Sequence, residues 1–261
     1  MLVSKDVRWV LLLALSGGSV LPARVIPSPR AEFRQLYALG PNGRVTIQNL
    51  YGDVTVTGWD RDDVLVEAVK RASDAGRMEN AQIVVEPSDG ALSIRTLYAG
   101  PQTGRPERVE YRITVPRATR LEQIRLVNGG LAIDGVSGAV KASSVNGGIK
   151  AQRMGGEVEL STVNGPVEAG FDQLSRSKPI SLTSVNGAIR LSIPVGAGAS
   201  LSAHNRSGGI DTEFGHAARQ SDGHWLRTRI NHGGAAIRLD NVKGGISIHA
   251  NWSGQARPTS L

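Results

Sequence analysis

The sequence predicts an all-β chain folded as a parallel β-solenoid, a β-helix-like stack of short coils of about 18 residues with a longer-stranded N-terminal portion. Three observations support this prediction: regularly spaced Val-Asn-Gly units, period-two alternation of apolar residues, and a scarcity of aromatic rings. Aromatic residues are 4% of the 261 residues, glycine accounts for 32, and cysteine is absent. The absence of cysteine excludes a disulfide framework, a zinc ribbon and a thiol nucleophile.

Residues 1–23 are predicted to be a signal peptide. Lys5 and Arg8 precede the short apolar run 9–15, small residues follow, and Ala23 is the expected last residue before cleavage. Because this run is shorter than the roughly 20 residues that a membrane-spanning helix needs, the mature chain is expected to have no integral membrane span. A buried N-terminal helix or strand is the alternative interpretation, and an uncleaved segment would act as a weak anchor.

The next segments are an N-terminal linker, predicted over residues 24–42, and the solenoid domain, predicted over residues 43–250. The early part of the domain contains longer strands, expected within 43–47, 51–59, 64–69, 83–86, 92–96 and 109–115. Ser73–Asn80 is expected to be a short polar connection with one helical turn. Ala99–Glu107, which contains two glycines and two prolines, is expected to be a loop.

Glycine recurs every nine residues in the central part of the chain, at positions 129, 138, 147, 156 and 165. Every second one of these glycines is the last residue of a Val-Asn-Gly unit. A fourth unit, at 185–187, follows an insertion around 171–179. Asn-Gly suits these corners because both residues tolerate positive φ. A meander of hairpins also uses such turns, but like turns recur every 18 residues. We therefore expect coils with two different corners, whose strands pair in parallel with the next coil.

Apolar residues flank these glycines on both sides, two positions before and two positions after. This alternation predicts that both positions face the core, including Val127, Val145 and Val163. The position three after each glycine should face outward. There, charges of opposite sign are 18 or 22 residues apart, as Lys141–Glu159 and Lys150–Glu168–Arg190. These residues are expected to form structural charge ladders, with Glu159 and Glu168 on opposite sides of the coil.

The sequence also resembles a known family. Gly52–Trp59, an acidic turn at 60–63, a strand ending in Val69-Lys70, and the stacked Val-Asn-Gly units are similar to the DUF4097 family of adhesin-labelled proteins. The resemblance covers roughly residues 40–250. It implies an exported β-helix-like domain of bacterial envelope proteins, with no established chemistry and no functional residues to carry over.

The coils are expected to become irregular after Pro194, with a loop at 216–224. Terminal coils must cover the exposed strand edges, otherwise the stack would polymerise. Trp225, Trp252 and the polar C-terminal tail, residues 251–261, are candidates for this cap.

No catalytic, cofactor-binding or metal site is predicted. Asp60, Asp62 and Asp63 could ligate calcium, but their spacing lacks the glycine and distal glutamate of an EF-hand loop, so a solvated acidic turn is expected. The histidines are scattered and fit no zinc motif; they are His204, His216, His224, His232 and His249. The serines form no nucleophile elbow, the glycine-rich turns lack a phosphate-binding motif, and no basic patch with interleaved aromatics points to nucleic acid.

The formal net charge is +7, without a dense Lys/Arg run. Together these features predict a non-enzymatic exported module of the periplasm or cell surface, adhesin-like, whose partner is an envelope glycan, lipid or protein. The alternatives are a carbohydrate-active β-helix enzyme, which needs clustered charged groups and aromatic platforms, and an envelope-stress sensing or regulatory protein.

Overall fold

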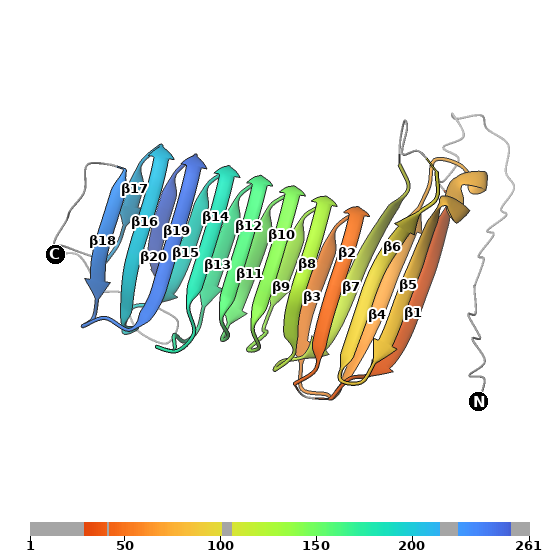
Figure 1. The fold of residues 1–261 in the computed structure, drawn as a ribbon, viewed down its shortest axis with the longest axis horizontal. Coiled ribbons are helices and arrows are strands. Elements are labelled where there is room, and N and C mark those ends of the chain that lie inside the picture. Colours follow the sequence, from red (N-terminus) through yellow and green to blue (C-terminus); the bar gives the residue numbers. More distant parts are fainter. Residues whose placement is uncertain (1–28, 41, 101–105, 215–223, 252–261) are drawn as a thin grey trace, which may run out of the picture.

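The computed structural model describes residues 29–40, 42–100, 106–214 and 224–251, and these form two ten-stranded sheets that enclose one core (Figure 1). Sheet A runs, from edge to edge, through β1 (Arg30–Ala38), β4 (Asp63–Arg71), β7 (Arg108–Pro116), β3 (Val54–Trp59), β9 (Leu131–Asp134), β11 (Ile149–Met154), β13 (Val167–Phe171), β15 (Ile189–Pro194), β20 (Ile246–Asn251) and β17 (Ile210–Thr212).

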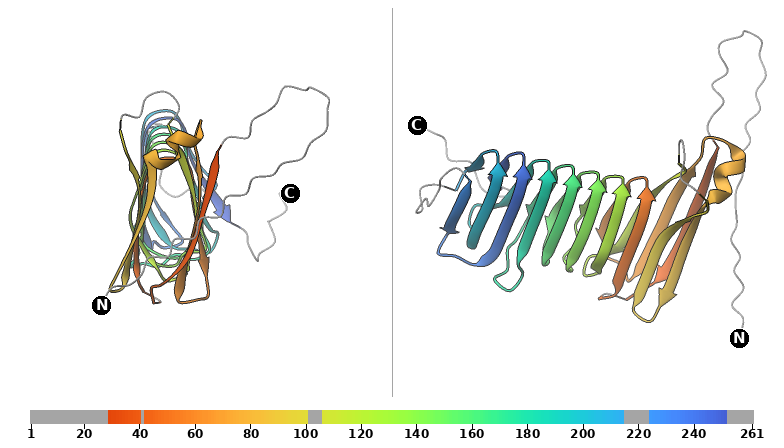
Figure 2. Two further views of the ribbon diagram at one scale, coloured as in Figure 1. Left: turned by 90° about the vertical axis from the view of Figure 1, so that its right-hand side faces the viewer. Right: turned by 45° about the horizontal axis from the view of Figure 1, so that its top comes forward.

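Sheet B faces sheet A across the core, and Figure 2 shows the two layers from the end of the stack. It runs through β18 (Trp225–Ile230), β16 (Ala199–Ser207), β19 (Ala235–Lys243), β14 (Ile180–Asn186), β12 (Val158–Asn164), β10 (Val140–Asn146), β8 (Arg120–Asn128), β2 (Arg44–Tyr51), β6 (Ala91–Tyr98) and β5 (Ala81–Ser88). The all-β prediction is confirmed. Both sheets are open, with free edges at β1 and β17 and at β18 and β5.

The helical content of the described residues is one short 3-10 helix, Ala75–Asn80, which lies within the connection predicted at Ser73–Asn80. The Asp74 side chain caps it by accepting a hydrogen bond from the Arg77 backbone N–H, at 3.1 Å. No helix among the described residues is long and apolar enough to cross a membrane. The predicted signal peptide lies outside the described residues, as do parts of the loops expected at Ala99–Glu107 and 216–224.

From β8 to β15 the chain alternates between the two sheets, and each strand pairs in parallel with the strand one repeat later. Asn146 is the register partner of both Asn128 and Asn164, and Asn164 is also paired with Asn186. The predicted lateral contact between segments 18 residues apart is therefore confirmed, as is the insertion before β14. Small buried residues such as Ala142 and Ala151 fit the narrow space between the sheets.

The Val-Asn-Gly corners require glycine because the backbones of adjacent repeats touch. A Cβ atom on Gly147 would lie 2.0 Å from the carbonyl oxygen of Gly129, and one on Gly187 would lie 2.0 Å from that of Gly165. The predicted positive φ is wrong for Asn146 and Gly147, neither of which has a left-handed backbone. Close approach of two main chains, and not the turn conformation, selects glycine here.

The valine of each Val-Asn-Gly unit faces away from the core, and the prediction that it is buried is wrong. The buried residue is the one before it, which is Ser144, Thr162 or Ser184 in successive repeats. Each hydroxyl donates a hydrogen bond of 2.9–3.2 Å to a glycine carbonyl at the corner of the adjacent repeat. The inward position thus satisfies a corner carbonyl, and the alternation changes phase across the Asn-Gly turn.

The N-terminal end departs from the repeat. Strand β1 lies within residues 24–42, so part of the predicted linker belongs to sheet A. The pairs β1–β4, β4–β7 and β5–β6 are antiparallel. Charged residues on edge strand β1, including Arg30, Glu32 and Arg34, oppose pairing with another chain. The linker prediction missed this strand because its polar outward residues mask the alternation.

The C-terminal end is irregular, as expected, and its order is not sequential. Strands β19 and β20 lie between β14/β15 and β16/β17, although they follow all of these in the sequence. Strand β18 pairs antiparallel with β16 and forms the edge of sheet B. Trp225 lies on this edge strand and stacks on His204, with ring centroids 4.0 Å apart. Trp252 and the rest of the predicted tail after Asn251 lie outside the described residues.

A buried tyrosine makes stability sensitive to alkaline pH. Tyr111 lies in the core, its hydroxyl is 2.7 Å from the Thr96 hydroxyl, and burial raises its pKa to about 12. Tyr111 ionises near pH 10 in the unfolded chain but stays neutral there in the folded chain. Its contribution to the free energy of unfolding is therefore complete below pH 10 and is lost as pH rises to 12. We expect the ionisation of Tyr111 alone to lower the free energy of unfolding by about 1 kcal/mol at pH 11.

Urea unfolding at pH 9 and pH 11 measures this loss. Tyr111→Phe is expected to be less stable at pH 9, because Thr96 loses its partner, but to lose less stability between the two pH values. An equal loss in both proteins would assign the alkaline sensitivity to other groups.

Candidate functional site

An apolar row, exposed at four positions and half-buried at three, crosses the outer face of sheet B, and seven strands contribute to it. We call it the apolar row: Leu97, Leu50, Val127, Val145, Val163, Val185 and Val242. Register places these side chains next to one another on adjacent strands from β2 to β19. Leu50 and Leu97 each lie two residues beyond the paired Gln48 and Arg95. Leu97 is 46% exposed and Val145 and Val163 are each 41% exposed, whereas such side chains are usually buried.

Two polar rows border the apolar row. On one side, the amides of Asn128, Asn146, Asn164 and Asn186 form a ladder in which each Nδ2 donates to the preceding Oδ1, at 2.8–2.9 Å. On the other side lie the outward-facing Ser143, Ser161 and Thr183, which are in register on β10, β12 and β14. One kind of side chain (amide, apolar or hydroxyl) therefore extends along each row, and the central part of the face is regular in chemistry as well as in geometry.

The outer face of sheet B is strongly basic. Its outward-facing strand residues include nine bases and four acids: Arg44, Arg95, Arg120, Arg125, Lys141, Arg206, Arg227, Arg229 and Arg238 against Glu86, Glu122, Glu159 and Asp240. The outer face of sheet A has eight bases and seven acids: Arg30, Arg34, Arg71, Arg108, Arg112, Lys150, Arg153 and Arg190 against Glu32, Asp63, Glu67, Glu110, Asp134, Glu168 and Asp211. Most of the net positive charge of the strands is thus on one face.

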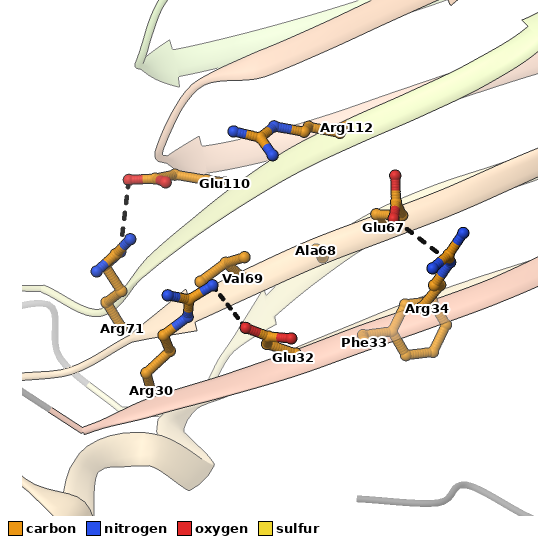
Figure 3. A pocket seen from close by; sticks show the side chains of 10 residues that line it. All are labelled: Arg30, Glu32, Phe33, Arg34, Glu67, Ala68, Val69, Arg71, Glu110 and Arg112. Carbon is orange, nitrogen blue, oxygen red and sulfur yellow. Dashed lines mark ion pairs between the residues drawn. The ribbon is translucent and has the colours of Figure 1, made fainter. Parts of the chain in front are cut away.

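A second candidate site is an open cavity of about 250 Å³ at the N-terminal end of sheet A, between side chains of β1, β4 and β7 (Figure 3). Three ion pairs line it: Arg30–Glu32, Arg34–Glu67 at 3.4 Å, and Arg71–Glu110 at 3.8 Å. Arg112 also lines the cavity and has no ion pair among the described residues. The cavity can accept one small anionic group, but all three carboxylates that line it are paired with arginines.

The acidic turn does not gather its carboxylates around a common point. Asp60 pairs with Arg117 at 2.7 Å, and Asp63 pairs with Arg61 at 2.7 Å. The Asp62 backbone carbonyl accepts the N–H groups of residues 39 and 40. In the described part of the chain, no group of three or more Asp, Glu or His side chains is arranged to hold a metal ion.

The histidines also remain apart. His204 stacks on Trp225 near the C-terminal edge, and His249 lies 3.2 Å from Glu213. His224 contacts the Asn205 carbonyl at 3.0 Å through Nδ1. His232 has a left-handed backbone in a turn, and His216 lies outside the described residues.

The register of the predicted charge ladders is confirmed, and two of their three pairs form ion pairs. Lys141 pairs with Glu159 at 2.8 Å on sheet B, and Arg190 pairs with Glu168 at 2.7 Å on sheet A. Lys150 is in register with Glu168 on the adjacent strand. Glu159 and Glu168 lie on different sheets, so they cannot act together as a catalytic pair.

Sequence reasoning missed the apolar row and the cavity. The signal for the row was present in the valines 18 residues apart, but it was assigned to the core. The cavity depends on the antiparallel pairing of β1 with β4 and of β4 with β7, which the repeat does not encode.

No protein-family model matches the chain, and no curated protein matches its sequence. Its fold is similar to that of a solved "putative cell adhesion protein" from Clostridium sporogenes, with a TM-score of 0.52 and 14% identity over 85% of this chain and 100% of the other. More distant matches are two proteins described as a "putative adhesin". One is from Parabacteroides merdae, with a TM-score of 0.35, 8% identity, and 83% and 95% coverage of the two chains. The other is from Bacteroides fragilis, with a TM-score of 0.33, 9% identity, and 84% and 97% coverage.

Proposed function

We propose that this protein is an exported β-solenoid that acts as a non-enzymatic, adhesin-like interaction module at the cell surface or in the periplasm. The binding surface in this proposal is the outer face of sheet B. The observation that carries it is the apolar row, because a continuous and partly exposed line of apolar side chains with polar borders is typical of an interaction site.

Two further observations support the proposal. The alternation of the chain between two sheets, with parallel neighbours one repeat apart, supports the solenoid interpretation. The C. sporogenes protein whose fold is similar to that of this chain is described as a "putative cell adhesion protein". This description supports an adhesin-like role.

The arrangement of charged groups supports a role without catalysis. The three carboxylates of the cavity each have an arginine partner, and Phe33 is the aromatic residue that lines it. A glycoside-cleaving site needs a pair of carboxylates that act as acid and as base or nucleophile. Carboxylates that are each paired with an arginine on an open sheet face are better suited to neutralising those arginines than to acid–base catalysis.

Retention on cell-envelope fragments, measured by co-sedimentation, tests the proposal. We expect the full chain to be retained, and the double variant V145T/V163T to be retained at least threefold less, because it makes two central positions of the apolar row polar while keeping β-branched residues. The control L65T changes an outward-facing apolar residue of β4 on sheet A, outside the cavity, and should be retained like the parent. Equal retention of all three proteins would exclude sheet B as the binding surface. Release of soluble sugar fragments would support the enzyme alternative.

A further inference from the structure

The outer face of sheet B carries uncompensated positive charge beside its apolar row. Each of its four acids forms an ion pair with one base of the same face: Arg95–Glu86, Arg120–Glu122, Lys141–Glu159 and Arg238–Asp240. The other five bases have no ion pair among the described residues; they are Arg44, Arg125, Arg206, Arg227 and Arg229. All five are exposed, so their charges are available to an external partner.

Two of these arginines lie close to the apolar row. Arg125 is two residues before Val127 on β8 and lies beside Ser143 of β10. Arg206 continues the row itself, because register places it next to Val242 on β19. Apolar and cationic side chains therefore project from the same side of the same strands.

The shape of this face restricts the partner. The apolar row extends over seven strands, or roughly 30 Å at the usual spacing between strands. It lies on the surface of an open sheet rather than in a groove. A partner that covers it must itself be broad, must offer apolar contact along the row, and must be anionic.

We infer that the outer face of sheet B docks on a lipid bilayer that contains anionic lipids. The apolar row would enter the boundary between headgroups and acyl chains, and the five unpaired arginines would contact phosphates. The long arginine stems allow the guanidinium groups to reach the headgroups while the valines lie deeper. A hydrophilic polyanion, in contrast, would satisfy the arginines and leave the apolar row in water. The inference rests on the proposed function and names its partner.

Binding to lipid vesicles tests this inference. We expect the full chain to bind vesicles of phosphatidylcholine with one-quarter phosphatidylglycerol at least tenfold more tightly than vesicles of phosphatidylcholine alone. R125Q/R206Q should bind the anionic vesicles at least fivefold more weakly, and V145T/V163T at least threefold more weakly. The matched control R108Q/K150Q removes two exposed bases of sheet A that lie outside the cavity and have no ion pair among the described residues, and it should bind within twofold of the parent. Residues 1–23 are present in the parent and in every variant, so their contribution to vesicle binding is the same in all of these proteins.

The side of the molecule that meets the lipid can be read directly because the chain has no cysteine. S161C places a single thiol on the outer face of sheet B, and S192C places one on the outer face of sheet A. With an environment-sensitive fluorophore on that thiol, we expect anionic vesicles to shift the emission of the S161C protein to the blue and to leave that of the S192C protein unchanged. Equal shifts, or a shift confined to S192C, would overturn the inference.

Failure of this inference can be distinguished from failure of the proposed function. If V145T/V163T weakens retention on envelope fragments but the parent does not bind anionic vesicles, the bilayer inference is overturned and the proposed function stands. If binding to a purified anionic glycan depends on Arg125 and Arg206 but not on the valines, the partner is a polyanion and the bilayer inference is again overturned. If the chain binds neither envelope fragments nor vesicles, both proposals fail.

Discussion

Gly147→Ala is expected to lower the free energy of unfolding by about 3 kcal/mol, because the added methyl group would overlap the main chain of the adjacent repeat. The new Cβ would lie 2.0 Å from the Gly129 carbonyl oxygen and 2.5 Å from its carbonyl carbon. The Gly129 backbone has no room to withdraw, since its carbonyl accepts the Ser144 hydroxyl and Gly129 itself lies against the carbonyl of Gly52. Urea unfolding measures the change.

Gly209→Ala is the matched control for this prediction. Gly209 also lies at a corner between the sheets, but no atom lies within 4 Å of its added Cβ, and its φ is not positive. Its variant should unfold within about 0.5 kcal/mol of the parent. Similar stabilities for the two variants would show that close stacking does not determine the choice of glycine.

Asn49→Asp is expected to cost at least about 3 kcal/mol, because it replaces a buried donor with a charged acceptor. Asn49 is 3% exposed, and its Nδ2 donates to the carbonyls of Tyr51, Gly52 and Val109 at 2.8–3.2 Å. A carboxylate has the same shape but cannot donate, so all three carbonyls would lose this donor beside a new negative charge, and the Tyr51 carbonyl would keep only the Tyr98 hydroxyl. The loss should be smaller at low pH, where the carboxyl is neutral.

Asn146→Asp tests whether this cost comes from burial. Asn146 makes side-chain hydrogen bonds to Asn128 and Asn164 within the exposed asparagine ladder, where water replaces a lost partner. We expect this variant to lose about 1 kcal/mol. If urea unfolding gives equal losses for the two variants, burial does not make the hydrogen bonds of Asn49 more stabilising than those of Asn146.

The regular middle of the fold could be predicted from the sequence because its information is local and repeated. Glycines nine residues apart mark the corners, and residues 18 apart pair, as the charge ladder from Lys141 to Glu159 shows. The same logic failed at the valines of the Val-Asn-Gly units. A corner can shift the alternation by one residue, and composition alone does not show that Ser144 and Thr162 replace the valines on the inside.

The ends of the molecule, and with them the cavity, could not be predicted in this way. Pairing between β1, β4 and β7 joins segments with no shared repeat, so no spacing in the sequence relates Arg30, Arg71 and Arg108, which are adjacent in the sheet. The excess charge on one face was likewise invisible in the formal total of +7, because it depends on which side of each strand every arginine occupies.

The position of β19 and β20 has a consequence for synthesis. A ribosome delivers β16, β17 and β18 before the two strands that separate them from β14 and β15. The stack therefore cannot be completed in the order in which the chain emerges, because β16 and β17 can pair with β19 and β20 only after those two strands have been made. Folding then ends with the placement of β19 and β20 between strands that were made earlier. A nascent chain that stalls before Ala235 lacks this internal pair of strands.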